Sequence, residues 1–520
     1  MDVLPPPPGE PASSLKRWLA FAFLVALLAF GFQGSRGIWE PDEGFYVNAS
    51  LGMLNTGDWI VPRLNGEPFL DKPPLLYWGS ALGMRVLGKN EWGARIPHAI
   101  WFSLTVVLVG LMGRQLLGNG RGGLAALVYC TSLLPFLGAN VLTPDTVLAF
   151  CTALALFCYC GALQSTGGGK ARIVWWLAMG AATGLGGLAK GPAVLIFVFP
   201  SAVHYLWSRG LRRALLDPLP YAALLVAGAI ALPWYGTVAS RLPGAARYFL
   251  DNQVAGRLMT ARYHRNSGGF LSGALYYLPV LAIGALPWSL AAWPFLIKRW
   301  RFKGLGPLAR RIAAGPGDSP VALLALSVLI PLVVLTAAQS RLPLYVLPLF
   351  VPLALATAAG IHGASLLPRA PRYRLAMRAL GVFWVIVLIG LKAGAAHLDT
   401  DRSSRAYAAS LGAIAGSRDA EIVDVDLKLN GLPLYGYTRF EAVTTEKNPY
   451  PFFTPIESLE VEAEEMRGDD EREAHLFIVP PPKLQQVSLA LLRTDDPCRV
   501  VGKARRSILL YCPARPALTR

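Results

Sequence analysis

Charged side chains gather in one stretch that follows the first long apolar run of the chain. Between Trp39 and Tyr77 this stretch holds Asp42, Glu43, Asp58, Arg63, Glu67, Asp71 and Lys72. A loop that only joined two membrane spans could be far shorter. Carboxylates can orient an acceptor or take its proton, and cations can stabilise a phosphate that leaves with negative charge. We therefore interpret this stretch as half of an active site at a membrane surface.

Three carboxylates are the candidate catalytic groups. Asp42 and Glu43 follow a proline, and Asp145 follows Thr143 and a second proline, so that each group opens a predicted helix. Proline at the first helical position followed by an acid is also simply a good helix start, with Thr143 as the cap. Both interpretations stay open for each site, and we expect the three acids to act in catalysis.

Five cations are candidates for binding a phosphate. Lys72 precedes two prolines that fix its approach to an apolar segment, and Lys190 lies in A-K-G-P, where two apolar runs meet. Arg341 lies in a tight Q-S-R-L-P turn, and Arg262 and Arg265 belong to a long loop. A lysine or arginine at a membrane surface can also serve only as an anchor whose charged end reaches the headgroups.

A divalent metal stays open as a cofactor. Asp71 and His264 are the candidate ligands, although a lone histidine is more often not a ligand. The cysteines show no zinc-type spacing, and four of the six lie in apolar runs, where thiols behave as small apolar groups. Cys498 and Cys512 lie in the polar tail, where a disulfide between them is expected if the tail is outside the cytoplasm.

The composition identifies a polytopic α-helical membrane protein. The 520 residues are 54% hydrophobic and only 16% charged, whereas soluble proteins carry about 25% charge. Apolar runs of the roughly 20 residues that a span needs recur until about His397. The net charge of +17 comes mostly from basic residues between the spans, where they meet lipid headgroups, so that nucleic acid is not an expected partner.

About eleven spans (10–13) satisfy the rule that basic loops face the cytoplasm. The run from Leu75 to Leu87 is too short to cross and is expected to lie at the interface. Besides 18–32, the predicted spans lie near 97–117, 122–140, 145–163, 174–190, 191–208, 219–237, 274–297, 319–338, 344–361 and 379–397. This alternation places all the unusual polar motifs on the extracytoplasmic face.

The chain is predicted to have three parts. Residues 1–17 form a disordered cytoplasmic N-terminus, and residues 18–397 form the membrane domain, with extracytoplasmic loops 35–96 and 238–273. Residues 398–520 form a soluble α/β domain on the same outer face. In the first loop we expect a helix from Pro41 to about Asn55, closed by Gly57. In the tail we expect strands at 421–427 and 475–479, a hairpin at 499–511, a helix at 407–414 and an acidic run at 457–473 that is a solvated face or a loop.

Taken in order, these motifs resemble one family. D-E-G-F-Y, G-D-W-I-V-P-R-L-N-G-E-P-F-L-D-K-P-P-L-L-Y-W and N-E-W-G-A-R-I-P are similar to the amino-terminal region of bacterial aminoarabinose (4-amino-4-deoxy-L-arabinose) lipid A transferases. Those enzymes are relatives of the dolichyl-phosphate-mannose protein mannosyltransferases. The later T-P-D, L-A-K-G-P, Y-Y-L-P…L-P-W-S and Q-S-R-L-P-L-Y-V-L-P stretches match the same family, and the resemblance covers roughly residues 18–362.

The resemblance implies a GT-C glycosyltransferase of the bacterial inner membrane with a periplasmic active site. The donor would be a polyprenyl-phosphate sugar, and the acceptor would be lipid A or another envelope glycolipid, polysaccharide or protein. Asp42, Lys72, Asp145 and Lys190 match the family's motifs, whereas the loop around residues 262–265 matches only loosely. Phe45 stands where family members often have arginine, which leaves the sugar and the acceptor open.

The chemistry of such a transfer agrees with the residues present. An anomeric C–O bond breaks and a phosphate leaves, so that cations must stabilise the departing charge. A single displacement would invert the anomeric centre. The competing interpretations are a lipid transporter, which would place its charges near the bilayer midplane and show repeated halves, and a non-enzymatic sensor that binds headgroups.

Overall fold

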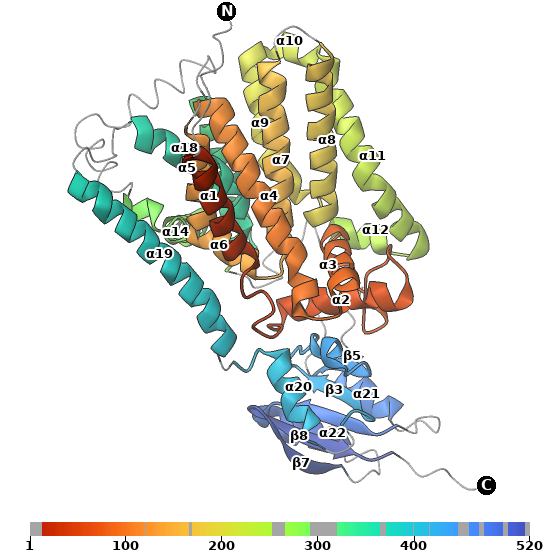
Figure 1. The fold of residues 1–520 in the computed structure, drawn as a ribbon. Helices are drawn as coiled ribbons and strands as arrows, with labels where there is room; N and C mark the ends of the chain where they lie inside the picture. Colours follow the sequence, from red (N-terminus) through yellow and green to blue (C-terminus); the bar gives the residue numbers. More distant parts are fainter. Residues whose placement is uncertain are drawn as a thin grey trace, which may run out of the picture.

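The computed structural model describes most of the chain. The described residues are 13–118, 120–165, 169–251, 266–291, 320–363, 371–398, 400–414, 417–445, 457–466, 473–491 and 498–514. They form a bundle of apolar helices and, beyond one end of it, an α/β unit that contains the C-terminal strands (Figure 1). The predicted site residues Arg262, His264 and Arg265 lie outside the described part of the chain.

The bundle is built from helices that run side by side between its two ends (Figure 1). Their bounds are α1 Ser13–Phe30, α4 Glu91–Leu117, α5 Gly122–Thr131, α6 Leu133–Asn140, α7 Pro144–Gln164, α8 Lys170–Lys190, α9 Ala193–Arg209, α11 Pro218–Arg241, α14 Phe270–Gly284, α17 Val321–Ala337, η2 Pro343–Leu349, α18 Phe350–Gly363 and α19 Pro371–His397. Since α1 begins at Ser13, the predicted disordered segment is wrong for residues 13–17, whereas residues 1–12 are not described.

Several of these helices could cross a membrane, so the chain is a multi-pass α-helical membrane protein. Within the described ranges, five helical segments are long and apolar enough to cross, and a sixth is possible if α5 and α6 count as one span despite their 62° bend. Three more apolar helices, α9, α14 and α17, are shorter. The count of eleven spans therefore stays a prediction.

The first loop folds against one end of the bundle. Helix α2 (Asp42–Thr56) begins after Pro41 and ends at Gly57, whose φ of 74° is a left-handed conformation that glycine adopts without steric cost. A short hairpin of β1 (Arg63–Leu64) and β2 (Glu67–Pro68) follows, and then α3 (Leu75–Leu87). The predicted helices at 41–55 and 75–87 are confirmed.

The C-terminal α/β unit contains a six-stranded sheet in the order β5-β4-β3-β6-β8-β7. Its first four strands in that order are parallel, and β8 and β7 add an antiparallel hairpin. Helix α20 (Ser404–Gly412) packs on one face of the sheet, and α21 (Leu459–Glu465) and α22 (Leu484–Leu491) pack on the other. The strands are β3 Glu421–Val425, β4 Phe440–Thr444, β5 Glu457–Ser458, β6 His475–Val479, β7 Arg499–Ala504 and β8 Ser507–Cys512.

Most of the secondary structure predicted for the tail is present. The two strands, the hairpin and the helix are found within a few residues of their predicted bounds. The acidic segment forms α21 within its described part, with Glu460, Glu464 and Glu465 on a solvated face, as predicted, and Leu459 and Ala463 buried against the sheet. A hydrophobic pair four residues apart puts one helical face in the core. The disulfide between Cys498 and Cys512 is confirmed.

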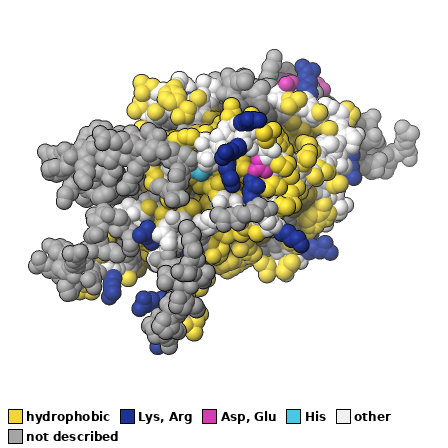
Figure 2. Space-filling view, turned by 90° about the horizontal axis from the view of Figure 1, so that it is seen from above, with side chains coloured by type: hydrophobic (Ala, Val, Ile, Leu, Met, Phe, Trp, Pro, Cys, Tyr) yellow, Lys and Arg dark blue, Asp and Glu magenta, His cyan; other side chains and the backbone are white. Residues whose placement is uncertain are grey.

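Basic side chains gather at the end of the bundle that carries α10 (Leu211–Leu215), far from the α/β unit (Figures 1 and 2). Exposed basic residues of this end are Lys170, Arg209, Arg212 and Arg213. The chain direction of α7 and α8 puts Asp145 and Lys190 at the opposite end, next to α2 and α3. The polar motifs therefore lie at one end of the bundle and the basic loops at the other.

Glycines allow α8 and α11 to approach closely. A Cβ added to Gly180 would lie 2.3 Å from the carbonyl oxygen of Ala223, and one added to Gly184 would lie 2.8 Å from that of Ala227. Such small residues let membrane helices pack backbone to backbone. The close contact positions the two helices that flank the pocket described below.

Gly180→Ala is expected to lower the melting temperature of the purified protein, although alanine favours helix formation. The added methyl group meets backbone that cannot rotate away, and overpacking of this kind costs roughly 1–3 kcal/mol. Gly236→Ala in α11 is the control, since nothing lies within 4 Å of its added Cβ. Equal melting temperatures for the two variants would contradict the close-packing argument.

Candidate active site

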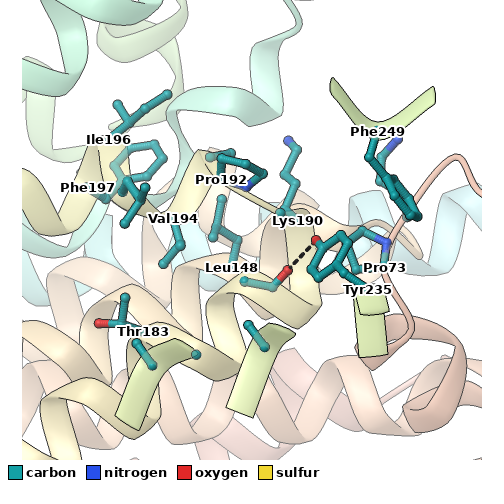
Figure 3. Close-up of a pocket in the computed structure, with 18 of the residues that line it drawn as sticks. Pro73, Leu148, Thr183, Lys190, Pro192, Val194, Ile196, Phe197, Tyr235 and Phe249 are labelled. Carbon is teal, nitrogen blue, oxygen red and sulfur yellow. Dashed lines mark hydrogen bonds between the residues drawn. The ribbon is translucent and has the colours of Figure 1, made fainter. Parts of the chain in front are cut away.

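One pocket of about 580 Å³ opens at the end of the bundle that carries the polar motifs. One part of its lining is polar and contains Asp71, Lys72, Lys190, Ser340 and Tyr345. The remainder is almost wholly apolar and is formed mainly by residues of α8, α9 and α11. In Figure 3, Lys190 lies between Val194, Ile196 and Phe197 on one side and Pro73, Tyr235 and Phe249 on the other.

Two lysines reach this pocket, each paired with an aspartate. Lys72 is only 6% exposed, and its Nζ donates to Asp71 Oδ2 at 2.5 Å. Lys190, the last residue of α8, pairs with Asp145 in the first turn of α7, and its Nζ lies 4.0 Å from the centre of the Tyr345 ring. The structure therefore brings together motifs that are more than 100 residues apart in the sequence.

The negative charges of three aspartates, Asp42, Asp71 and Asp145, act on the hydroxyl group of Tyr46. Burial raises the pKa of Tyr46 well above its usual value, and the negative charges of Asp71, Asp42 and Asp145 raise it further. Asp42 is exposed at the start of α2, and its carboxylate forms no hydrogen bond with another residue of the described chain. Asp42 and Asp145 do not themselves line the pocket but lie beside it.

Glu43 is buried, whereas the neighbouring Asp42 is exposed. Glu43 is 1% exposed and forms ion pairs with Arg36 at 2.6 Å and Arg95 at 2.8 Å. Its carboxylate also accepts hydrogen bonds from the backbone of Trp39 and Leu142. Burial alone would raise the pKa of the Glu43 carboxyl, but the charges of the two arginines outweigh burial and hold it well below its usual value. These contacts give Glu43 a structural role, and its expected catalytic role stays a prediction.

Arg341 is likewise turned away from a ligand. Its side chain is fully buried, and its guanidinium donates to the carbonyl groups of Asn266, Gly268, Gly269 and Thr336. These bonds hold a turn together, so the geometry does not favour the expected role in binding a phosphate. Thr143 occupies the N-cap position of α7 and Pro144 begins the helix, as predicted, although the Thr143 side chain makes no cap hydrogen bond.

Sequence reasoning missed several groups at the site. Tyr345 and Ser340 line the pocket, and their hydroxyl oxygens have no hydrogen-bond partner in the part of the chain that is described. Tyr235 donates to the carbonyl oxygen of Gly187 at 3.0 Å (Figure 3). The Q-S-R-L-P-L-Y motif contains two of these residues, but its arginine drew the interpretation because charge is the stronger local signal.

Asp71, one of two candidate metal ligands, is paired with Lys72. Among the described residues, no group of three or more histidine, cysteine, aspartate or glutamate side chains could hold a metal ion. His264, the other candidate, lies outside those residues.

Comparison with known proteins agrees with this geometry. A family model described as dolichyl-phosphate-mannose-protein mannosyltransferase matches residues 71–236. An undecaprenyl phosphate-alpha-4-amino-4-deoxy-L-arabinose arabinosyl transferase of Pseudomonas paraeruginosa is 34% identical over 64% of this chain. A crystal structure of ArnT from Cupriavidus metallidurans in the apo state has a TM-score of 0.75 over 96% of this chain. The chain has the fold of the solved ArnT structures.

The similarity in sequence covers only part of the Pseudomonas relative, whereas the similarity in fold covers nearly all of the Cupriavidus structures. The match to the Pseudomonas transferase covers 58% of that relative's length, so the chain spans less than two thirds of it. The Cupriavidus structures, one of them bound to undecaprenyl phosphate with a TM-score of 0.73, match over 98% of their own length at 19% identity. The chain therefore shares the fold of these structures over 96% of its length.

Glu43→Gln is expected to destabilise the protein by roughly 3–5 kcal/mol at neutral pH, since it leaves two arginines without their buried counter-charge. A carboxyl whose pKa is lower in the folded state stabilises above its unfolded-state pKa of about 4.3 and loses that contribution as the pH falls further. The difference in melting temperature from wild type should therefore be largest at neutral pH and shrink in strong acid. Glu464→Gln, in an exposed position of α21, is the control, and a pH-independent difference would contradict this account.

Proposed function

We propose that this chain transfers a sugar from a polyprenyl-phosphate donor to an acceptor of the cell envelope. The observation that carries the proposal is the pocket, which joins two lysines at one end to a long apolar surface between α8, α9 and α11. A lipid phosphate has the same two parts, an anion at headgroup depth and an apolar chain. A soluble nucleotide sugar would leave the apolar surface without a partner.

The polar end of the pocket has the groups that a phosphate requires. Lys72 and Lys190 supply positive charge, and the hydroxyl groups of Ser340 and Tyr345 are available to donate hydrogen bonds. When the anomeric C–O bond breaks, its electron pair goes to the phosphate oxygen, and these groups stabilise the charge that develops there. Asp71 and Asp145 hold the two lysines in place before the donor enters.

Asp42 is placed for the acceptor. It is exposed at the start of α2, and its charge raises the pKa of Tyr46, as the charges of Asp71 and Asp145 also do. It would orient the attacking oxygen and accept its proton if the acceptor is a hydroxyl group, while a phosphate acceptor would need only to be oriented. Attack from the side opposite the leaving phosphate inverts the anomeric centre, and retention in the product would reject this single displacement.

The relatives narrow the substrates of the proposed reaction. The curated Pseudomonas proteins are named for undecaprenyl phosphate-aminoarabinose, and one solved ArnT binds undecaprenyl phosphate. We propose undecaprenyl phosphate as the lipid of the donor, and lipid A or a related glycolipid as the acceptor. A protein or polysaccharide acceptor is the alternative. Phe45, at the start of α2, stands where the family often has arginine and is the first position at which the sugar or acceptor could differ.

The orientation follows from the charge of the two ends. Loops rich in lysine and arginine stay in the cytoplasm, which supports a cytoplasmic location for the α10 end (Figure 2). The site and the α/β unit would then face the periplasm, and the disulfide fits that compartment. The proposed arrangement is a membrane domain at 18–397 with about eleven spans and a periplasmic domain at 398–520.

Lys72→Ala and Asp42→Asn are expected to lower kcat for transfer from undecaprenyl-phosphate sugar by roughly 10²–10³-fold, as removal of one electrostatic contact to a transition state does. Lys170→Ala is the matched control, since this exposed lysine lies at the other end of the bundle. The measurement is product formation by purified protein in lipid, followed by mass spectrometry. Full activity in both Lys72→Ala and Asp42→Asn would contradict the assignment of the active site.

Ala227→Trp is expected to weaken binding of undecaprenyl phosphate at least about tenfold, which corresponds to roughly 1.4 kcal/mol. Ala227 lines the apolar part of the pocket, and a large ring there takes the place of the lipid chain. Ala229→Trp is the control, because Ala229 lies two positions along α11, is exposed and does not line the pocket. Binding is measured by native mass spectrometry, and equal affinity in the two variants would place the lipid elsewhere.

A further inference from the structure

The segment before Asp42 is held by the C-terminal α/β unit. Trp39 and Ser403 form an antiparallel bridge, in which the Glu40 amide donates to the Arg402 carbonyl group at 2.8 Å. The Ser404 amide donates to the carbonyl oxygen of Ile38 at 3.0 Å. The chain that leads into α2 is therefore paired with backbone more than 350 residues away.

Glu40 lies at the centre of this contact. It is 5% exposed, and its Oε1 accepts hydrogen bonds from the Ser404 hydroxyl group and from the Gly431 amide, the latter at 2.6 Å. Burial raises the pKa of the Glu40 carboxyl well above its usual value, which favours the neutral acid. The site described above does not use this buried acid, although only Pro41 separates it from Asp42.

Two glycines enclose the Glu40 carboxyl group from opposite sides. A Cβ on Gly44 of α2 would lie 1.9 Å from Glu40 Oε2, and a Cβ on Gly431 would lie 2.8 Å from Glu40 Oε1. Gly431 has φ −82°, which any residue adopts, so its absence of a side chain serves this close approach and not the local backbone. The carboxyl group is thus packed between the start of α2 and the α/β unit.

The loop that presents Gly431 is itself rigid. It follows β3 at the carboxyl end of the parallel strands, the edge where open α/β sheets carry their functional loops. Buried Asp424 accepts hydrogen bonds from the amides of Leu427 and Leu429, and Asp426 and Lys428 both adopt φ 60°. Residues other than glycine stay in that conformation only when their surroundings fix it.

We propose that Glu40 is a positioning residue for Asp42, and that through Ser404 and Gly431 it makes the C-terminal α/β unit a working part of the active site. The Asp42 carboxylate forms no hydrogen bond of its own within the described chain, so its position depends on the backbone at the start of α2. A displacement of about 1 Å at a reacting group can cost ~10²-fold in rate. This inference rests on the proposed catalytic role of Asp42.

The test compares Glu40→Ala, Glu40→Gln and Gly431→Ala in the full-length protein in lipid. Glu40→Ala and Gly431→Ala are expected to lower kcat between roughly tenfold and 10²-fold and to leave the KM for the donor within about twofold, since the pocket is untouched. Glu40→Gln retains the accepting oxygen in the neutral form and should recover most of the lost kcat. Arg439→Ala is the control, because it breaks only exposed contacts inside the α/β unit, an ion pair with Glu473 and a 3.5 Å hydrogen bond to the Asp419 carbonyl oxygen.

Hydrogen exchange of residues 38–46 is the second readout and needs no turnover. Faster exchange in Glu40→Ala and Gly431→Ala, with wild-type exchange in Glu40→Gln, is expected. Unchanged exchange and kcat in the alanine variants would overturn the inference, as would an equal loss of kcat in Glu40→Gln and Glu40→Ala. If the wild-type protein transfers no sugar at all, the proposed function fails, while the exchange pattern still decides whether Glu40 holds the start of α2.

Discussion

The buried ion cluster of Glu43 with Arg36 and Arg95 is the interaction on which the rest of the site depends. A carboxylate this deeply buried is stable only when it is paired and fully hydrogen-bonded. It satisfies that condition by joining the first loop to α4 and to the backbone before α7. The same contact orients the start of α2, where Asp42, the residue before Glu43, is exposed.

The pocket has an apolar part and a polar part, which lie in different surroundings. Its apolar part lies between membrane helices, whereas its lysines lie where these helices end, so each part is in the environment it prefers. Each lysine keeps an aspartate as its partner, which lowers the cost of holding a cation in a largely buried position. Glycines on α8 let α11 approach closely, and these two helices flank the pocket.

The charged residues in the sequence indicated which motifs lie at or beside the pocket, but not the role of each residue. Lys72, Lys190 and Asp145 could be predicted because a polar residue at the end of an apolar run is costly and visible in the sequence. Asp42 and Glu43 could not be distinguished, since one is exposed and the other buried only because of residues far away in the chain. Arg341 was expected to bind phosphate because it is charged and lies at the end of an apolar run. Its partners are backbone carbonyl groups, which every residue has, so the sequence gives no sign of them.

The sequence alone determined the membrane character of the chain, most of its helices and strands and the end at which the polar motifs gather. These features follow from hydrophobicity, charge and turn chemistry, which act between neighbouring residues. The tertiary structure decided which acid is buried, which hydroxyl groups enter the pocket, and that Glu40 contacts the C-terminal unit. Those outcomes depend on contacts across hundreds of residues, because burial and pairing are properties of the folded chain and not of any one segment.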